Sequence, residues 1–356
     1  MAHSIAAGDR RRIGIACNNE TRRLYLHPAD LGRLERLGQV VLEEYDVTGP
    51  GWETPAVPAV EDQFISFAAD LDVLLLGRGA PRVSERVLAA APRLKLVGEI
   101  EGDRFSRLVD MPAARKAGVL IVDTTNASSG PVAEWALALA LVGLRQHARF
   151  RDIIGGKTMS YADYWTNPPA RELTGKRVGM IGFGHIAWRL RELLTPFEVS
   201  ILAYDPYAPR ELADAVGIDF TTLDRVMGCD VVICLAPATP ATTGMIGARE
   251  LALLPRDAVF VNVSRAVVVD LDALVAKAKL EDAWFCIDVH DPEPLAVDSP
   301  LIGLRNVFLS PHIGGNTAES LPRYFGLMVD EVERYFAGLE PRAQITDRVV
   351  AGRGGH

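Results

Sequence analysis

The chain has 356 residues, of which 49% are hydrophobic and 24% charged, a composition that indicates a folded protein with two domains. A formal net charge of −8 disfavours nucleic acid as a partner, and the basic run at residues 10–12 is more simply a solvated end. No apolar run reaches the roughly 18 residues that a membrane span needs, so no membrane partner is expected.

The first part of the chain alternates short apolar strands with helices. Strands are predicted at residues 11–17, 71–77, 94–98 and 119–122, and helices at 28–37, 84–91 and 111–117. Such alternation favours a parallel sheet with helices on both faces, the doubly wound α/β class. No glycine fingerprint follows these strands, so this part is predicted to lack a nucleotide-binding turn.

A long apolar helix is predicted at residues 131–149. Its segment 132–144 comes nearest to a membrane span, but it contains Glu134 and is too short. We therefore expect this helix to be buried in the protein.

Residues 177–188 are the stretch around which the chain is organised. An apolar strand stops at Gly182, and apolar residues recur at helical spacing after Gly184, which predicts a strand, a tight turn and a helix. Gly182 would allow the turn, Gly184 would let the backbone approach a pyrophosphate, and the small Ala187 would let the helix pack on the strand. The pattern alone is weak, because many ordinary turns contain two glycines.

The context of this turn strengthens the prediction of a dinucleotide-binding unit. A second strand at 199–204 ends in Asp205, about 20 residues after the glycines, where the fold needs a carboxylate for the adenosine ribose hydroxyls. The charge of Asp205 would repel a 2′-phosphate, which favours NAD over NADP. The alternative, an ordinary turn former before Pro206, is disfavoured because all parts arrive in the required order.

Further strands are predicted at residues 231–235, 258–263, 283–287 and 306–310, separated by helices. A last helix at 322–336 is expected to return to the first domain. The predicted fold class is α/β, with two doubly wound parallel-sheet domains, of which the second is a Rossmann NAD-binding domain.

Three polar residues follow three of these strands. Hydride transfer between a carbonyl and a nicotinamide needs an acid/base, a cation that polarises the substrate, and a site beyond the carboxyl ends of the strands. Arg265 can hold a carboxylate through two parallel hydrogen bonds, and His312 can exchange the substrate proton while Glu293 holds its other ring nitrogen. A surface arginine and a structural histidine are the alternatives, but three such strand ends together favour a site.

The cysteines and the N-terminal residues bear on the compartment. Cys17, Cys229, Cys234 and Cys286 stand singly, with no C-x-x-C pair, so we expect reduced core residues and no metal site. Residues 1–9 have neither the basic start nor the apolar core of a signal peptide, so a cytoplasmic protein is expected.

Together these motifs resemble one family. From about residue 97 to residue 317 the chain is similar to the D-2-hydroxyacid dehydrogenases, the D-isomer-specific family that includes phosphoglycerate dehydrogenase and glyoxylate/hydroxypyruvate reductase. The matching stretches, in the family's order, are 132–134, 182–187, 204–206, 237–244, 262–265, 287–294 and 310–315.

The resemblance implies site residues in both domains. The catalytic set is expected to be Arg265, Glu293 and His312, with Arg265 on the substrate. Substrate contacts are expected from a loop at Ile100, Glu101 and Gly102, because family members hold the substrate carboxylate on backbone N–H groups there. Cofactor contacts are expected at Gly182, Gly184, His185, Ile186, Asp205, Ala236, Pro237, Thr242, Val263, Asp288 and Gly315.

The resemblance also implies the domain organisation. Residues 1–126 and 317–356 are expected to form a flavodoxin-like substrate-binding domain, and residues 127–316 the NAD-binding domain. The family is dimeric, and the helix at 131–149 with the arm after it usually forms the interface, so we expect a homodimer with a small-molecule substrate.

Two single residues depart from the family pattern. His185 stands where Arg or Lys usually follows the second glycine, which removes a permanent charge near the pyrophosphate. Ala266 stands where Gly usually follows Arg265, which is expected to tighten that loop.

The substrate loop departs further, because residues 98–107 include extra residues and are acidic. Glu99, Glu101 and Asp103 would oppose a substrate carboxylate unless they point away or pair with Arg104 and Arg107. This loop favours a larger or partly cationic substrate over the usual small 2-oxo acids.

The predicted function is NAD-dependent hydride transfer between nicotinamide and a 2-oxo or 2-hydroxy acid of D configuration. The alternative is an NADH-binding regulatory or corepressor-like module without significant turnover, which the complete catalytic trio disfavours. A formate-like or phosphite-like hydride donor is a third possibility, which the acidic loop makes less attractive. The particular acid and the physiological direction stay open.

Overall fold

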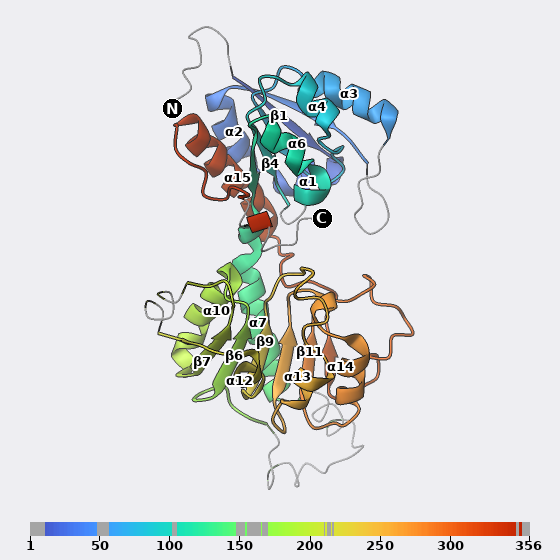
Figure 1. Ribbon diagram of the computed structural model, residues 1–356, viewed down its shortest axis with the longest axis vertical. Coiled ribbons are helices and arrows are strands. Elements are labelled where there is room, and N and C mark those ends of the chain that lie inside the picture. The colour runs from blue at the N-terminus through green and yellow to red at the C-terminus, as the bar shows by residue number, and fades with distance from the viewer. Residues whose placement is uncertain are drawn as a thin grey trace. The chain divides into compact units, whose positions relative to one another are not determined.

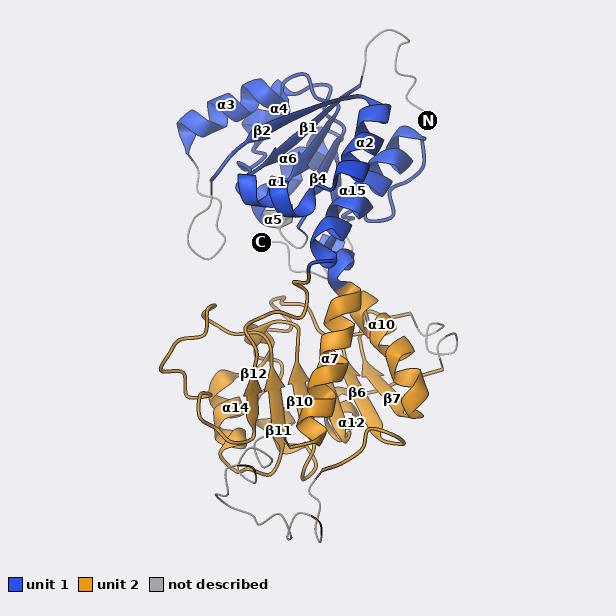
Figure 2. Cartoon of the chain, turned by 180° about the vertical axis from the view of Figure 1, so that it is seen from behind, with its two compact units in different colours: residues 1–128, 318–356 blue, residues 129–317 orange. Residues whose placement is uncertain are grey.

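The computed structural model describes residues 11–47, 57–101, 105–146, 170–209, 217–346 and 349–350, with the single positions 154, 165, 211 and 215. The chain divides into two compact units, which Figure 2 shows in different colours. Unit 1 comprises residues 1–128 and 318–356, and unit 2 comprises residues 129–317.

Unit 1 contains a five-stranded sheet with the order β2-β1-β3-β4-β5, in which every neighbouring pair is parallel. This is the 2-1-3-4-5 order of flavodoxin-like doubly wound folds. The strands are β1 (Arg12–Cys17), β2 (Gln39–Glu44), β3 (Val73–Leu76), β4 (Leu96–Glu99) and β5 (Leu120–Asp123).

The helices of unit 1 cover both faces of this sheet (Figure 1). One face carries α3 (Pro58–Ala68), α4 (Glu85–Ala90) and α6 (Met111–Lys116). The other carries α1 (Asn19–Tyr25), α2 (Pro28–Leu37) and α15 (Ser320–Phe336). Two short helices, α5 (Phe105–Leu108) and the 3-10 turn η2 (Thr125–Ser128), follow β4 and β5.

Helix α15 brings the end of the chain back to unit 1. It buries Phe325, Met328 and neighbouring apolar residues against the sheet, and a Cβ atom on Gly98 would lie only 2.3 Å from Met328 Sδ. Each such large apolar side chain contributes about 1.5–3 kcal/mol when it is fully buried. On the surface, Arg33 Nη2 of α2 contacts Glu333 Oε2 of α15 at 2.7 Å. The predicted return of the last helix is confirmed.

In unit 1, the sequence analysis missed β2, α1 and α3. Strand β2 lies at the sheet edge and is only half-buried, so its apolar signal is short. Helix α1 is only seven residues long, which leaves little periodicity to detect.

Unit 2 contains a seven-stranded parallel sheet with the order β12-β11-β10-β9-β6-β7-β8. Counted from β6, six of these strands have the 3-2-1-4-5-6 order of the dinucleotide-binding fold, whose topological switch point lies between β6 and β9. The strands are β6 (Arg177–Ile181), β7 (Ser200–Tyr204), β8 (Asp219–Phe220), β9 (Val231–Cys234), β10 (Val259–Asn262), β11 (Trp284–Ile287) and β12 (Val307–Leu309). The predicted fold class is confirmed.

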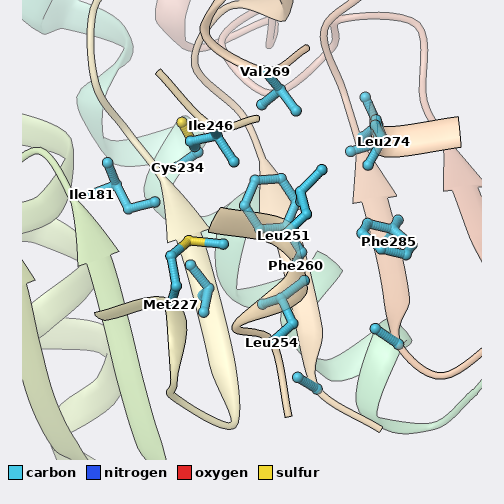
Figure 3. Packing of buried hydrophobic residues seen from close by; sticks show 14 of the residues in the cluster. Ile181, Met227, Cys234, Ile246, Leu251, Leu254, Phe260, Val269, Leu274 and Phe285 are labelled. Atoms are coloured by element: carbon cyan, nitrogen blue, oxygen red, sulfur yellow. The ribbon is translucent and has the colours of Figure 1, made fainter. Parts of the chain in front are cut away.

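Helices also cover both faces of the sheet in unit 2. One face packs against α7 (Ser129–Leu144) and α10 (His185–Leu194), which the short turn η3 (Thr195–Phe197) follows. The other packs against α12 (Leu223–Met227), α13 (Ala248–Ala252) and α14 (Leu271–Ala278), and η4 (Ala266–Val268) lies in the loop after β10. Figure 3 shows this second cluster, with Phe260 and Phe285 from the strands near Leu251 and Leu274 from the helices.

Helix α7 starts earlier and ends sooner than the predicted 131–149. It ends at Leu144, and Gln146 shortly after it adopts a left-handed φ of 52°, which ends the helical backbone. The stretch Thr125–Leu144 is long and apolar enough to cross a membrane by length and composition, but 56% of its apolar window is buried inside the protein. The prediction of a buried helix is confirmed.

The four cysteines are buried and unbonded, as predicted. Burial raises the pKa of Cys17 and of Cys286 to about 12. These thiols are therefore uncharged core groups at neutral pH.

Candidate active site

The glycine turn between β6 and α10 has the geometry that the sequence predicts. Gly182 has a φ of 89°, and a Cβ atom at this position would lie 3.0 Å from the backbone nitrogen of Ala236. Any larger residue would be strained and crowded here. Ala236, an expected cofactor contact, is thus packed against the turn and buried.

The start of α10 is open to a ligand. Gly184 is the N-cap and provides no side-chain cap, and a Cβ atom there would meet nothing within 4 Å. His185 and Ile186 form the first turn of the helix, while Ala187 is fully buried. The N–H groups of this first turn and the space beside Gly184 suit the pyrophosphate of a dinucleotide.

Asp205, at the end of β7, is already hydrogen-bonded to three backbone N–H groups. Its Oδ2 accepts from Phe183 N at 2.8 Å, and its Oδ1 accepts from Tyr207 N at 2.9 Å and Ala208 N at 3.1 Å. The carboxylate therefore holds the glycine turn to the end of β7 and lies where a ribose is expected.

The loop after β9 is closed by its own threonines. Thr242 Oγ1 donates to the carbonyl oxygen of Pro237 at 2.6 Å and accepts from Thr239 N at 2.8 Å. Pro237 is exposed at the start of this loop. Thr242 thus shapes the segment where the adenosine end of the cofactor is expected.

Arg265 is exposed just after β10, on a loop that buried polar groups hold. Asn262 is 2% exposed, accepts from Ser264 N at 3.1 Å and donates to the carbonyl oxygen of Arg265 at 3.2 Å. Cys234 Sγ lies 3.2 Å from Ser264 Oγ. Val263, an expected nicotinamide contact, lies between Asn262 and Ser264 in the sequence and is buried.

Glu293 and His312 are in direct contact. Both carboxylate oxygens of Glu293 lie 2.8 Å from His312 Nδ1, and both side chains are about one-third exposed. Burial raises the pKa of Glu293, but hydrogen bonds from the N–H of His290 and from the His312 ring outweigh it, so the pKa lies below its ordinary value. The carboxylate is therefore ionised at neutral pH and suited to hold the imidazole.

Asp288 lies behind this pair and is almost completely buried. Its carboxylate accepts hydrogen bonds from Ser310 Oγ and from the N–H groups of Ile313 and Gly314, which flank His312 and the expected cofactor contact Gly315. In the structure, Asp288 thus fixes the segment that carries His312.

In unit 1, the expected carboxylate-binding loop already uses its N–H groups. Ile100 is buried, and its N–H donates to the carbonyl oxygen of Leu76 at 2.9 Å. The N–H of Glu101 donates to Glu99 Oε1 at 3.0 Å. Gly102 lies outside the described residues.

The structure shows contacts of the acidic loop with residues distant in sequence. Glu101 Oε1 lies 3.5 Å from Arg78 Nε, after β3, and also accepts from Thr21 Oγ1 at 3.3 Å. Arg107 is exposed on α5, and Arg104 lies outside the described residues. Arg78 and Thr21 are distant from Glu101 in sequence, so local spacing could not reveal these contacts.

The sheet order places the three expected catalytic residues after three neighbouring strands, since β10, β11 and β12 precede Arg265, Glu293 and His312. Contact is established between Glu293 and His312. The sequence analysis did not identify Trp135, whose indole N–H donates to Asp288, or Asn262, which holds the loop of Arg265. A tryptophan inside a buried apolar helix was a usable signal, because its indole N–H needs an acceptor. Within the described ranges, no group of three or more His, Cys, Asp or Glu residues could hold a metal ion.

The fold and the glycine turn define unit 2 as a dinucleotide-binding unit. Residues 137–314 match the family model described as the NAD binding domain of the D-isomer specific 2-hydroxyacid dehydrogenases. The chain belongs to this family, and its cofactor is NAD.

Relatives of known sequence agree with this assignment. The D-3-phosphoglycerate dehydrogenase of Mycobacterium tuberculosis is 32% identical over 78% of this chain and 51% of its own length. That of Methanocaldococcus jannaschii is 28% identical over 88% of this chain and 56% of its own. The chain thus spans about half the length of these relatives. A Bacillus subtilis protein named as the 2-hydroxyacid dehydrogenase YoaD is 32% identical over 75% of this chain and 78% of its own.

Solved structures share the fold. A phosphoglycerate oxidoreductase from Rhizobium etli has a TM-score of 0.77 at 23% identity, covering 94% of this chain and 99% of its own. The D-mandelate dehydrogenase of Rhodotorula graminis has a TM-score of 0.77 at 19% identity, covering 95% and 98%.

Proposed function

We propose that the protein is an NAD-dependent oxidoreductase that transfers a hydride between nicotinamide and a 2-oxo or 2-hydroxy acid of D configuration. The observation that carries this proposal is the contact of Glu293 with His312 Nδ1 at 2.8 Å, in the unit that also holds the glycine turn. The names of the relatives, D-3-phosphoglycerate dehydrogenase among them, support this class of substrate.

His312 is the proposed acid/base. Because Nδ1 contacts Glu293, Nε2 is the ring nitrogen that exchanges a proton with the substrate oxygen. Glu293 keeps the ring oriented through its contact with Nδ1. Bound NADH would supply the hydride in the direction of reduction, or NAD⁺ accept it in oxidation.

Arg265 is the proposed substrate cation. Its Nη1 donates to the carbonyl oxygen of Ser264 at 2.8 Å, which orients the guanidinium, and the guanidinium carries five N–H donors in all. Two parallel hydrogen bonds to a carboxylate would hold the acid and polarise the adjacent carbonyl.

The loop of unit 1 is proposed to contribute less to substrate binding. The substrate contacts expected at Ile100, Glu101 and Gly102 depend on backbone N–H groups, and the N–H of Glu101 already donates to Glu99. A substrate carboxylate would have to compete with this internal carboxylate. Arg265 is therefore proposed as the principal carboxylate contact.

The remaining cofactor contacts are proposed along unit 2. His185 and Ile186 would lie at the pyrophosphate, and Asp205 at the ribose, where its charge favours NAD over NADP. Ala236, Pro237 and Thr242 would lie near the adenosine. Val263, Asp288 and Gly315 would line the nicotinamide end.

A homodimer in the cytoplasm is proposed. On α7, the apolar residues Leu137, Leu141 and Val142 remain only partly buried, which suits a subunit interface. The four unbonded cysteines suit a reducing compartment.

The test is NADH oxidation by purified full-length protein against a panel of 2-oxo acids, with chiral analysis of the product. We expect turnover of at least one acid to a D-2-hydroxy product, and loss of turnover with retained NADH binding in the double variant His312→Ala and Arg265→Ala. Undiminished turnover in that variant rejects the assignment. Tight NADH binding without turnover of any acid would favour a regulatory module instead.

A further inference from the structure

We propose that Trp135 on α7 is a positioning residue for His312, and that it acts through the buried carboxylate of Asp288. The inference rests on the proposed role of His312 as acid/base. It assigns a function to a residue whose hydrogen bonds go to Asp288 and Ser310.

Four donors converge on the Asp288 carboxylate, which is 1% exposed. Oδ1 accepts from Trp135 Nε1 at 3.1 Å, from Ser310 Oγ at 2.5 Å and from Ile313 N at 3.1 Å. Oδ2 accepts from Gly314 N at 3.0 Å. A carboxylate buried this deeply needs such donors, because burial without them is costly.

Trp135 is the donor that comes from outside the loop. The other three donors belong to residues 310–314, the segment that carries His312 itself. Trp135 Nε1 also lies 3.2 Å from Ser310 Oγ, so the indole links both the carboxylate and the start of the segment to a helix buried in unit 2. In the described part of the chain, no Arg or Lys lies within ion-pair distance of Asp288 to replace this tie.

The backbone at His312 needs this restraint. His312 has a φ of 54°, in the left-handed region that residues with a side chain rarely adopt. The two N–H groups that follow it, at Ile313 and Gly314, both point to the Asp288 carboxylate. One buried group thus sets the backbone from which the imidazole projects.

The indole ring also supports the segment by packing. A Cβ atom on Gly314 would lie 3.1 Å from Trp135 Cδ1 and 3.0 Å from Asp288 Oδ2. The segment lies close to the ring. Replacing Trp135 with phenylalanine therefore tests the hydrogen bond of the indole N–H while an aromatic ring is kept. Trp135→Phe keeps an aromatic ring on α7, removes the N–H donor and reduces the size of the side chain.

The test compares Trp135→Phe with Trp188→Phe, a matched variant at a half-exposed tryptophan on α10. The first readout is the long-range ¹H–¹⁵N spectrum of the His312 ring, assigned with His312→Gln. In the wild-type protein we expect the proton on Nδ1, facing Glu293. In Trp135→Phe we expect mixed tautomers, whereas Trp188→Phe keeps the wild-type spectrum.

The second readout separates kcat from cofactor binding. Trp135→Phe is expected to lower kcat about tenfold and to leave the Kd for NADH within about twofold. A variant that merely lost stability would not change the tautomer at temperatures where it is folded. If Trp135→Phe does not fold, Ser310→Ala removes another donor to Oδ1 and is expected to change the tautomer in the same direction.

A wild-type tautomer together with a wild-type kcat in the folded variants would overturn the inference. Its failure is distinguishable from failure of the proposed function. If His312→Gln retained turnover, His312 would not be the acid/base, but the tautomer comparison would still show whether Trp135 holds the ring.

Discussion

Both sheets carry charged residues at or after the carboxyl ends of their strands, but these residues differ in exposure and in their hydrogen bonds. In unit 2, Arg265 is exposed, and Glu293 and His312 are each about one-third exposed while contacting one another. In unit 1, Glu99 is 1% exposed and Asp123 is 3% exposed. Glu99 bonds to the N–H of Glu101, and Asp123 accepts from Thr125 N at 2.6 Å.

The comparison shows that doubly wound parallel sheets share an edge geometry and not a chemistry. In unit 2 the polar groups of the edge remain accessible to a substrate, and buried groups such as Asp288 and Asn262 hold the loops beneath them. In unit 1 the carboxylates of Glu99 and Asp123 accept hydrogen bonds from nearby backbone N–H groups. The chemistry of the protein is therefore expected to lie in unit 2, and unit 1 to tune binding.

The largest effect is expected at Arg265. Arg265→Ala removes the cation that binds and polarises the substrate, and we expect kcat/KM for the 2-oxo acid to fall about 10³-fold. Arg265→Lys should recover only a part, because an ammonium cannot form the two parallel hydrogen bonds. The Kd for NADH, measured by fluorescence, should stay within about twofold.

The matched control for this prediction is Arg189→Ala. Arg189 is exposed on α10 and pairs with Glu192 of the same helix. It should leave kcat/KM unchanged. Equal losses in both variants would mean that removal of any positive charge from unit 2 weakens turnover, which contradicts a specific role for Arg265.

Glu293→Gln is expected to lower kcat about 10²-fold, because the imidazole loses the carboxylate that orients it. Asp291→Asn, an exposed neighbour in the same loop, is the control and should retain wild-type kcat. Steady-state kinetics at saturating NADH measure the effect. A Gln variant as active as the Asn control would remove Glu293 from the mechanism.

The same variant also tests the lowered pKa of Glu293. A carboxyl whose pKa is lower in the folded state contributes stability above its unfolded pKa of about 4.3, and this is lost as the pH falls through the folded pKa. The contribution should stay under about 1 kcal/mol, because the pair is partly exposed. Urea unfolding should thus separate wild type from Glu293→Gln at neutral pH, and the difference should shrink as the pH falls below about 4.3.

Asp205 belongs to unit 2, but its carboxylate oxygens accept hydrogen bonds from backbone N–H groups, as those of Glu99 and Asp123 do in unit 1. Asp205→Ala should therefore loosen the glycine turn and raise the Kd for NADH about 10- to 30-fold, since each hydrogen bond to a charged group contributes about 1.5–3 kcal/mol. Because the repulsion of a 2′-phosphate is lost as well, the affinity for NADPH should fall less than the affinity for NADH. Asp219→Asn, on the edge strand β8, is the control.

Fluorescence titration with both cofactors measures this effect. An Asp205→Ala variant that binds NADPH better than wild type does, with NADH binding intact, would show that the carboxylate acts only by repelling the 2′-phosphate. The structural role described for Asp205 would then be wrong.

The smallest effect on kinetics is expected in unit 1. Glu99→Ala releases the N–H of Glu101, so a substrate carboxylate no longer competes with Glu99, and KM should fall about fivefold with kcat unchanged. Unfolding should become easier by about 1–3 kcal/mol, because a buried group loses its partner. Glu20→Gln, an exposed acid paired with Arg78, is the control for charge alone. A large loss of kcat in Glu99→Ala would mean that unit 1 takes part in the chemical step, which contradicts this account.

Local patterns predicted the parts of the site that depend on short stretches of sequence. The glycine turn could be predicted because Gly182 and Gly184 follow a strand directly. Glu293 and His312 could be predicted because parallel strands end at one edge. The class of fold followed from the alternation of strands and helices.

Contacts between distant residues could not be predicted in the same way. Trp135 and Asp288 are 153 residues apart, and Glu101 contacts Arg78, which follows another strand. Neither a period nor a motif encodes such contacts, which only the packed fold brings together. Edge elements such as β2 and β8 were missed because they are half-buried or only two residues long.

The most direct test of the account is a single turnover of His312→Ala beside the wild-type protein. Each is loaded with NADH, mixed with an excess of the best 2-oxo acid, and followed by the loss of NADH absorbance. The account predicts equal NADH binding and a hydride-transfer rate at least about 10²-fold lower in the variant. A variant that transfers hydride at the wild-type rate would contradict the claim that unit 2 carries the acid/base of the reaction.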